Sequence, residues 1–181
     1  MNQKRAFRWN LILLFSVFNL FPLFPQEMEN KPTTIPNLRQ IAREIMNNAR
    51  YCALITASPD GQPYSRVMDA FAPDSNFVVW LGTNPRSRKV QRIQQNPKVT
   101  LFYFDKPGLG YVSLMGTAEL VNTPEEKEKH WKESWEAFYP DREKDYLLIK
   151  IHPVRLEVVS VKYNVSGDSL TWDPPVIEFA H

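Results

Sequence analysis

The stretch "KVTLFYF", residues 98–104, decides the fold class of this chain. Alternate side chains of a strand point to opposite faces, and both faces are apolar here, with Val99 and Leu101 on one face and Phe102 on the other. An antiparallel sheet with one face in water would alternate apolar with polar residues instead. The stretch therefore favours a small closed barrel, with its interior filled by side chains and its outside covered by helices or another subunit.

The sequence on either side supplies further strands, mostly joined by hairpin turns, of which Asp60-Gly61 is the strongest signal. The predicted strands are 51–57, 64–71, 76–82, 98–104, 111–121, 145–153 and 154–163. The predicted helices are 38–50 with Asn37 as N-cap, 87–95, and 123–140 with Thr123 as cap. On that last helix Trp131 and Trp135 are one turn apart, which is typical of packing residues. The fold class is mainly β with flanking helices.

Composition restricts the partners of the chain. Its 181 residues are 43% hydrophobic and carry a net charge of only +2. The first 30 residues hold three of the 22 Lys/Arg and two of the 20 Asp/Glu, so the remainder has 19 basic and 18 acidic residues. This near-balance provides no broad basic field for nucleic acid, and any anion site must be local.

The N-terminal segment differs from the rest of the chain. Three basic residues within the first eight positions precede an almost wholly apolar run at 11–24, as in a secretory signal. The predicted organisation is a signal peptide or N-terminal anchor at 1–25, a linker at 26–36, and a barrel domain at 37–181. No small-x-small cleavage site follows the apolar run. The chain is therefore expected to be exported, periplasmic or secreted, if the segment is cleaved, and membrane-anchored otherwise.

The familiar catalytic patterns are absent. The three histidines lie singly, Cys52 is the sole cysteine, and the six glycines of the chain form no nucleotide-binding fingerprint. We expect no metal site, we expect Cys52 to be a core residue, and no residue is assigned a catalytic role.

A different signal comes from "TNPRSRK", residues 83–89, which closes one strand and begins the helix 87–95. A helix N-terminus carries a partial positive charge, so cations in its first turn are electrostatically misplaced unless they hold an anion. Arg66 adds a further cation in the middle of the strand 64–71. Two readings stay open on the residues alone: a phosphate site, or a solvated basic run with Arg66 paired to a surface carboxylate.

The order of these motifs resembles that of the pyridoxamine 5'-phosphate oxidase-like FMN-binding split barrels, and most of all their general-stress-protein branch. The resemblance covers roughly residues 37–175 and is carried by "ALITASPDGQPYSRVM", "VVWLGTN", "SRKVQRIQQNPKVTLFYF", "YVSLMGTAEL" and "LTW". It implies a six-stranded split β-barrel of Greek-key topology. It also implies a homodimer with one FMN in each of the two clefts between subunits.

The resemblance further implies which residues contact FMN. The phosphate would be held by Arg66, Ser87, Arg88 and Lys89. The isoalloxazine ring would contact two strands at Val67, Met68, Leu81, Gly82, Thr83 and Asn84. Ser113 would face the flavin from the partner subunit, and Trp172 would lie near the ring. The family pattern assigns no role to Arg86.

The chain also departs from the family. No arginine–histidine element follows Trp172, so oxidation of pyridoxamine 5'-phosphate is not expected. The leading hypothesis is an FMN-dependent oxidoreductase-like stress protein that passes electrons between FMN and an unidentified small substrate. The alternatives are a non-catalytic module that binds or senses FMN or haem, a deazaflavin-binding barrel, and a structural dimer without a cofactor.

Overall fold

The computed structural model describes residues 35–180. The predicted signal or anchor segment lies outside this range, and so does nearly all of the predicted linker. Helix α1 (Ile35–Ala49) begins before Asn37, so the prediction that Asn37 caps this helix is wrong. The buried face of α1 has helical spacing and comprises Leu38, Ile41, Ala42, Ile45 and Met46. Between residues 35 and 180, no helix has the length and apolar character needed to cross a bilayer.

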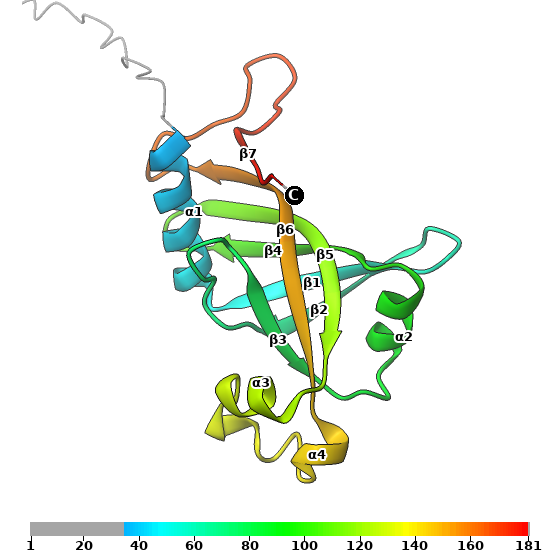
Figure 1. The fold of residues 1–181 in the computed structure, drawn as a ribbon. Helices are drawn as coiled ribbons and strands as arrows, with labels where there is room; N and C mark the ends of the chain where they lie inside the picture. The colour runs from blue at the N-terminus through cyan, green and yellow to red at the C-terminus, as the bar shows by residue number, and fades with distance from the viewer. Residues whose placement is uncertain (1–34, 181) are drawn as a thin grey trace, which may run out of the picture. The chain divides into compact units, whose positions relative to one another are not determined.

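The strands form one antiparallel sheet (Figure 1). They are β1 (Tyr51–Ala57), β2 (Pro63–Asp69), β3 (Val79–Thr83), β4 (Lys98–Asp105), β5 (Gly110–Val121), β6 (Leu147–Ser160) and β7 (Val176–Glu178). The order is β2-β1-β4-β5-β6-β3, with β7 paired to β6. In this order β3 returns to lie beside β6 of the consecutive strands β4, β5 and β6, which is a Greek key. The mainly β fold with few helices is confirmed.

The sheet curves into a barrel that stays open along one seam. Its end strands, β2 and β3, meet only at an isolated bridge between Ala70 and Leu81, where the Phe71 N–H donates to the Trp80 carbonyl at 3.0 Å. Beyond Thr83 the chain turns at Pro85, which has no N–H to extend a ladder toward β2. The closed barrel expected from "KVTLFYF" is thus corrected to a split one.

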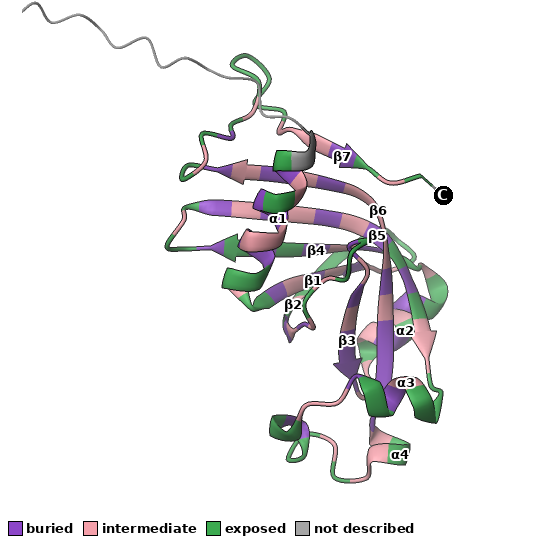
Figure 2. Ribbon diagram, turned by 60° about the vertical axis from the view of Figure 1, so that its left-hand side comes forward, coloured by how far each residue is buried: buried purple, intermediate pink, exposed green. Residues whose placement is uncertain are grey.

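The stretch "KVTLFYF" has unequal faces in the structure (Figure 2). Val99, Leu101 and Tyr103 are buried inside the barrel, as their spacing predicts. Phe102 and Phe104 point outward and are exposed, with 36% and 54% of their surface in contact with solvent. The outer apolar residues of β4 are therefore not covered by the described part of the chain, residues 35–180.

In place of the two strands predicted within 145–163, the structure has the single strand β6 (Leu147–Ser160), which runs through Pro153. The β5–β6 register shifts between Met115 and Gly116: Met115 faces Arg155 and Gly116 faces Pro153, so Val154 is extra. Such a bulge lets a strand contain a residue without an N–H. Gly116 is required there, since a Cβ would lie 2.5 Å from the His152 carbonyl oxygen.

Helix α2 (Arg88–Gln95) connects β3 to β4, in agreement with the predicted helix 87–95. The predicted helix 123–140 is wrong as one element. The chain there forms α3 (Pro124–Lys129), a 3₁₀ turn (Glu133–Trp135) and, further on, α4 (Arg142–Asp145). Thr123 caps α3 as predicted, accepting from the Glu126 N–H at 3.4 Å.

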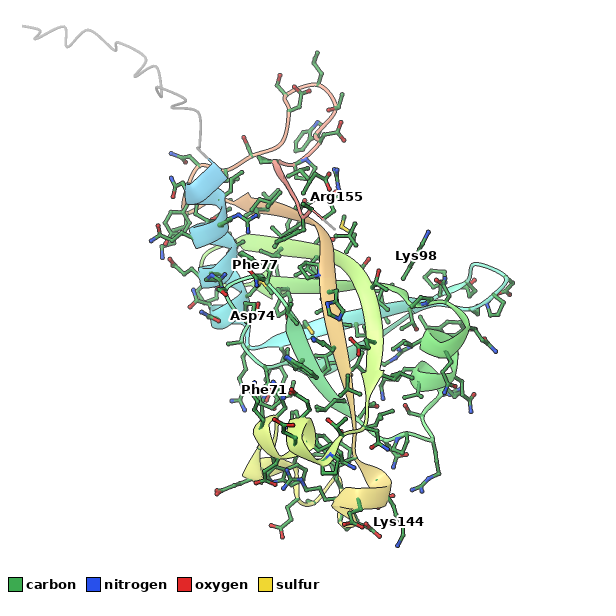
Figure 3. The ribbon with its side chains drawn as sticks, viewed as in Figure 1. Phe71, Asp74, Phe77, Lys98, Lys144 and Arg155 are labelled. Atoms are coloured by element: carbon green, nitrogen blue, oxygen red, sulfur yellow. The ribbon has the colours of Figure 1, made fainter. Side chains whose placement is uncertain are left out.

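Tertiary contacts end α3 early. Burial of Trp135 anchors the following turn, and the Tyr146 hydroxyl takes the carbonyl of His130 that a continuing helix would use. Helix propensity is a weak preference that such contacts override. Figure 3 shows Phe71 on the α3 side of the barrel, where it packs edge-on against His130 and Trp135 at ring distances of 5.3 and 5.5 Å. The predicted packing role of Trp135 is confirmed.

Candidate functional site

Three elements bring cations and hydroxyl groups together at the open seam of the barrel. Lys89, in the first turn of α2, donates from Nζ to Oγ1 of Thr83 at 2.8 Å, and that oxygen lies 3.3 Å from Oγ of Ser87. Arg66, on β2, donates from both terminal nitrogens to Oγ1 of Thr56 at 3.2 Å. We call Arg66, Thr83, Ser87 and Lys89 the cation site.

Neither cation of this site has an acidic partner among residues 35–180. Arg66 bonds only to the Thr56 hydroxyl and the Tyr64 carbonyl, which argues against its pairing with a surface carboxylate. Burial lowers the pKa of the Lys89 ammonium, and the charge of Arg66 lowers it further. Burial also lowers the pKa of Arg66, with added repulsion from Arg92 and Arg88. Two partly buried positive charges without a negative partner are unfavourable, and a bound anion would compensate them.

The start of α2 adds donors to the cation site. Ser87 occupies the N-cap position but makes no side-chain cap hydrogen bond, and the first turn has no acidic residue. The first N–H groups of α2 thus lack the usual side-chain acceptor. Arg86 differs from its neighbours, because it points to Asp145 and forms an ion pair at 2.5 Å. Its exclusion from the predicted site therefore agrees with its contacts.

A cavity of about 430 Å³ adjoins the cation site through Lys89, which is common to both. This volume lies within the range of small-molecule sites. Four predicted contact residues line it: Val67, Met68, Gly82 and Lys89.

One side of the cavity is an unpaired strand edge. The Phe71 N–H points across the seam to β3. Backbone groups of successive residues in a strand point in alternate directions. The N–H and C=O of Asp69 and Val67 therefore point to the same edge of β2 as those of Phe71. Beyond the bridge at Ala70, no described strand faces this edge of β2. The backbone of Val67 can therefore bond to a ligand with a planar donor–acceptor edge.

The opposite lining was not predicted. Ser134, Trp135, Phe138 and Tyr139 come from the segment expected to be plain helix. Trp135 fills the space above Gly82, where a Cβ would lie 2.4 Å from its ring. The glycine in an otherwise apolar strand was the signal that could have revealed this close approach.

Asp69 fixes this lining to β2. It accepts from Nζ of Lys132 at 2.9 Å and from Nε1 of Trp135 at 3.1 Å. Burial opposes ionisation of Asp69, but these two hydrogen bonds outweigh it, and the pKa of the carboxyl lies below its usual value. Asp69 is thus a charged, satisfied anchor rather than a free base.

The other predicted contacts are dispersed. The side chain of Leu81 is in the core, Asn84 accepts from the Arg86 N–H at 2.9 Å, and Arg88 is exposed. Ser113 lies on the outer face of β5 opposite Phe102. Trp172 is 82% exposed in the loop between β6 and β7. Neither of the last two lines the cavity of its own chain.

Two further predictions concern reactive groups. Cys52 is buried, and burial raises the pKa of its thiol to about 12, so it packs as an apolar residue. In the part of the chain that the structure describes, no three His, Cys, Asp or Glu side chains are grouped to hold a metal ion.

The family model described as "Pyridoxamine 5'-phosphate oxidase" matches residues 38–160, well over half of the sequence. General stress protein 26 of Bacillus subtilis (strain 168) is 26% identical over 128 residues, which cover 68% of this chain and 89% of that protein.

Solved structures agree with the fold. The crystal structure of General Stress Protein 26 from Bacillus anthracis str. Sterne has a TM-score of 0.63 and 26% identity, covering 78% of this chain and 98% of that one. A pyridoxamine 5'-phosphate oxidase-related, FMN binding protein from Nostoc punctiforme PCC 73102 has a TM-score of 0.56 and 15% identity, covering 85% and 100% respectively. The second likeness, at this identity, concerns the fold alone.

Proposed function

The chain belongs to the pyridoxamine 5'-phosphate oxidase family, and from this premise we propose that it binds FMN at the open seam of its barrel. The observation that carries the proposal is the pair Arg66 and Lys89, which are partly buried beside a cavity of about 430 Å³ and have no acidic partner among the described residues. The Nostoc relative, which has the same fold, is described as an FMN binding protein.

The residues present suit such a ligand. Arg66, Lys89 and the hydroxyls of Thr83 and Ser87 would hold the phosphate through charge-assisted hydrogen bonds. The backbone edge of Val67 would meet the polar edge of the isoalloxazine ring, with Met68 and Gly82 beside it. Asn84 and Arg88 would act from the periphery of the same site. Bound FMN supplies hydride or electron transfer, and the protein supplies anchoring, orientation and exclusion of water.

We further propose a homodimer through the outer face of the sheet. Phe102 and Phe104 expose apolar surface there, and exposed apolar patches of this kind mark interaction sites. A partner packed on this face would bring its own Ser113 and Trp172 within reach of the seam. Phe104→Glu is expected to yield monomers in light scattering, whereas an unchanged dimer would reject this face.

Turnover is a separate proposal. The leading form is an oxidoreductase that passes electrons between FMN and a small substrate. A non-catalytic FMN-binding module is favoured by one observation: Asp69, a carboxylate in the cavity, is already held by Lys132 and Trp135. Oxidation of reduced nicotinamide by the loaded protein, compared with free FMN, distinguishes the two.

Export or membrane anchoring through residues 1–25 is also a proposal. N-terminal sequencing of protein recovered from a cell envelope fraction tests it. A mature start within residues 20–36 supports cleavage, and an intact Met1 in membranes supports an anchor.

The binding proposal is tested by the absorbance spectrum of the purified full-length protein before and after addition of FMN. The expected result is a yellow protein that holds one FMN per chain after gel filtration. The spectrum also identifies haem or a deazaflavin, should either be bound instead. A folded protein that retains no FMN would overturn the proposal.

A further inference from the structure

We propose that the segment from Lys132 to Tyr139, here called the aromatic wall, is the second side of the ring site, and that Phe138 covers the bound ring. The proposal rests on the proposed FMN site and adds contacts that the sequence resemblance does not assign to the flavin. It concerns a segment that the sequence predicts only as part of the helix 123–140, with packing tryptophans.

The exposure of two apolar side chains at one cavity motivates the proposal. Val67 from β2 and Phe138 from the aromatic wall both line it, with 74% and 73% of their surface in contact with solvent. Removal of large apolar side chains at a cavity rim from water by a ligand lowers the free energy of the complex. A flat apolar ligand between them would bury both.

The wall is held in place rather than loosely attached. Lys132 and Trp135 both donate to Asp69, and Trp135 is only 7% exposed. The N–H of Phe138 donates to the carbonyl of Trp135 at 2.9 Å, which fixes the backbone of Phe138 relative to that anchor. The ring of Tyr139 packs on Trp135 at 6.1 Å. Phe138 is therefore an exposed side chain on an ordered support.

The two ends of the cavity define the chemistry of the occupant. Lys89 and, beside it, Arg66 require an anion, while Val67, Trp135 and Phe138 provide apolar and aromatic surface. A planar aromatic ring with an anionic tail meets both requirements. The backbone edge of Val67 adds hydrogen-bonding groups at the rim of the ring. Asp69 acts here as a positioning residue, since it holds the wall and is itself satisfied.

The test compares FMN with riboflavin, which has the same ring without the phosphate, by titration of flavin fluorescence. In Phe138→Ala we expect the dissociation constants for both ligands to rise by the same factor, about tenfold, through loss of a buried aromatic contact. Phe138→Tyr, which retains the ring, should restore both. Val161→Ala, at an apolar position that is 64% exposed and lies outside the cavity, is the control and should change neither.

The outcomes separate this inference from the proposed function. Wild-type protein that binds FMN while Phe138→Ala binds FMN and riboflavin equally well would overturn the aromatic wall and leave the FMN site intact. A Phe138→Ala effect on FMN alone, or one that Phe138→Tyr does not restore, also contradicts it. Folded wild-type protein that takes up neither flavin would overturn both proposals.

Asp69 is tested with the same ligands. Asp69→Asn keeps an acceptor for Trp135 but removes the charge that holds Lys132. We expect the dissociation constants of both flavins to rise by about threefold. The fluorescence anisotropy of the bound flavin should also be lower than in the wild type, because the wall is less firmly held. Unchanged anisotropy and affinity in this variant would contradict the positioning role.

Discussion

The two ends of the cavity treat charge in opposite ways. At the α2 end, Lys89 and Arg66 are partly buried and, within residues 35–180, bond only to neutral oxygens. At the other end, Asp69 is matched by Lys132 and by the indole of Trp135. Both ends use residues of β2, three positions apart in sequence, whose side chains project from opposite faces of the strand.

The difference separates structural charge from charge kept for a ligand. A satisfied buried network stabilises the arrangement that contains it, whereas like charges without a partner destabilise the ligand-free protein. Arg86 sharpens the contrast, because it is adjacent to the cation site in sequence yet is paired with Asp145. The candidate site is identified by basic side chains without an acidic partner among the described residues, and not by the number of basic residues.

The largest effect is expected for removal of the unpaired charges. Lys89→Met keeps most of the apolar stem but loses a charge-assisted contact of about 1.5–3 kcal/mol, so the dissociation constant for FMN should rise about tenfold or more. Adding Arg66→Ala should weaken binding further. Isothermal titration measures both. Arg86→Met is the matched control, and an equal loss there would mean that general positive charge, not this site, attracts FMN.

Removal of the Asp69 carboxylate should lower the stability of the folded protein. Asp69→Ala leaves Lys132 without its carboxylate and Trp135 without an acceptor, at an expected cost of about 1–3 kcal/mol in the free energy of unfolding. Urea denaturation without FMN measures this cost. Glu119→Ala breaks the exposed pair with His152 and should cost less than about 1 kcal/mol. Equal costs for the two variants would remove the distinction between the two kinds of charge.

A smaller effect of opposite sign is expected at the unpaired end. Lys89→Met should leave the ligand-free protein at least as stable as the wild type, because it removes repulsion from Arg66 and a desolvated charge. Melting temperatures without FMN test this. A clear decrease would show that the Lys89–Thr83 hydrogen bond is structural.

The smallest effect concerns pH. The pKa of Lys89 in the folded, ligand-free protein lies below its ordinary value of 10.5, so the unfolded chain holds this proton to higher pH. Stability without FMN should therefore rise as the pH increases through that interval, while FMN affinity falls as the ammonium loses its charge. Urea and FMN titrations at several pH values measure the two trends. Lys89→Met should abolish both, and their persistence would assign them to another group.

Much of this pattern is visible in the sequence, because it depends on local periodicity. The alternation in "KVTLFYF" identifies the buried face of β4, and the cations of "TNPRSRK" identify the start of α2. Family order then brings Arg66 to the same place. These features depend on neighbouring residues or on a shared chain order, so they can be predicted from the sequence.

The remaining features depend on contacts between distant residues. The bulge at Met115 and Gly116 allows β6 to pass through Pro153, where the sequence alone indicates a break. The contacts of Trp135 with Asp69 and Gly82 end the predicted helix and place Phe138 at the cavity. The periodicity of residues 123–140 does not predict where the helix ends or that Phe138 lies at the cavity.

The most direct test of the cation site is the ratio of the riboflavin and FMN dissociation constants in wild type and in Lys89→Met. If the unpaired cations hold the phosphate, wild-type protein should bind FMN at least about tenfold more tightly than riboflavin, and the variant should lose most of that preference. An equal preference in both proteins would contradict the assignment of Lys89 and its neighbours to the phosphate.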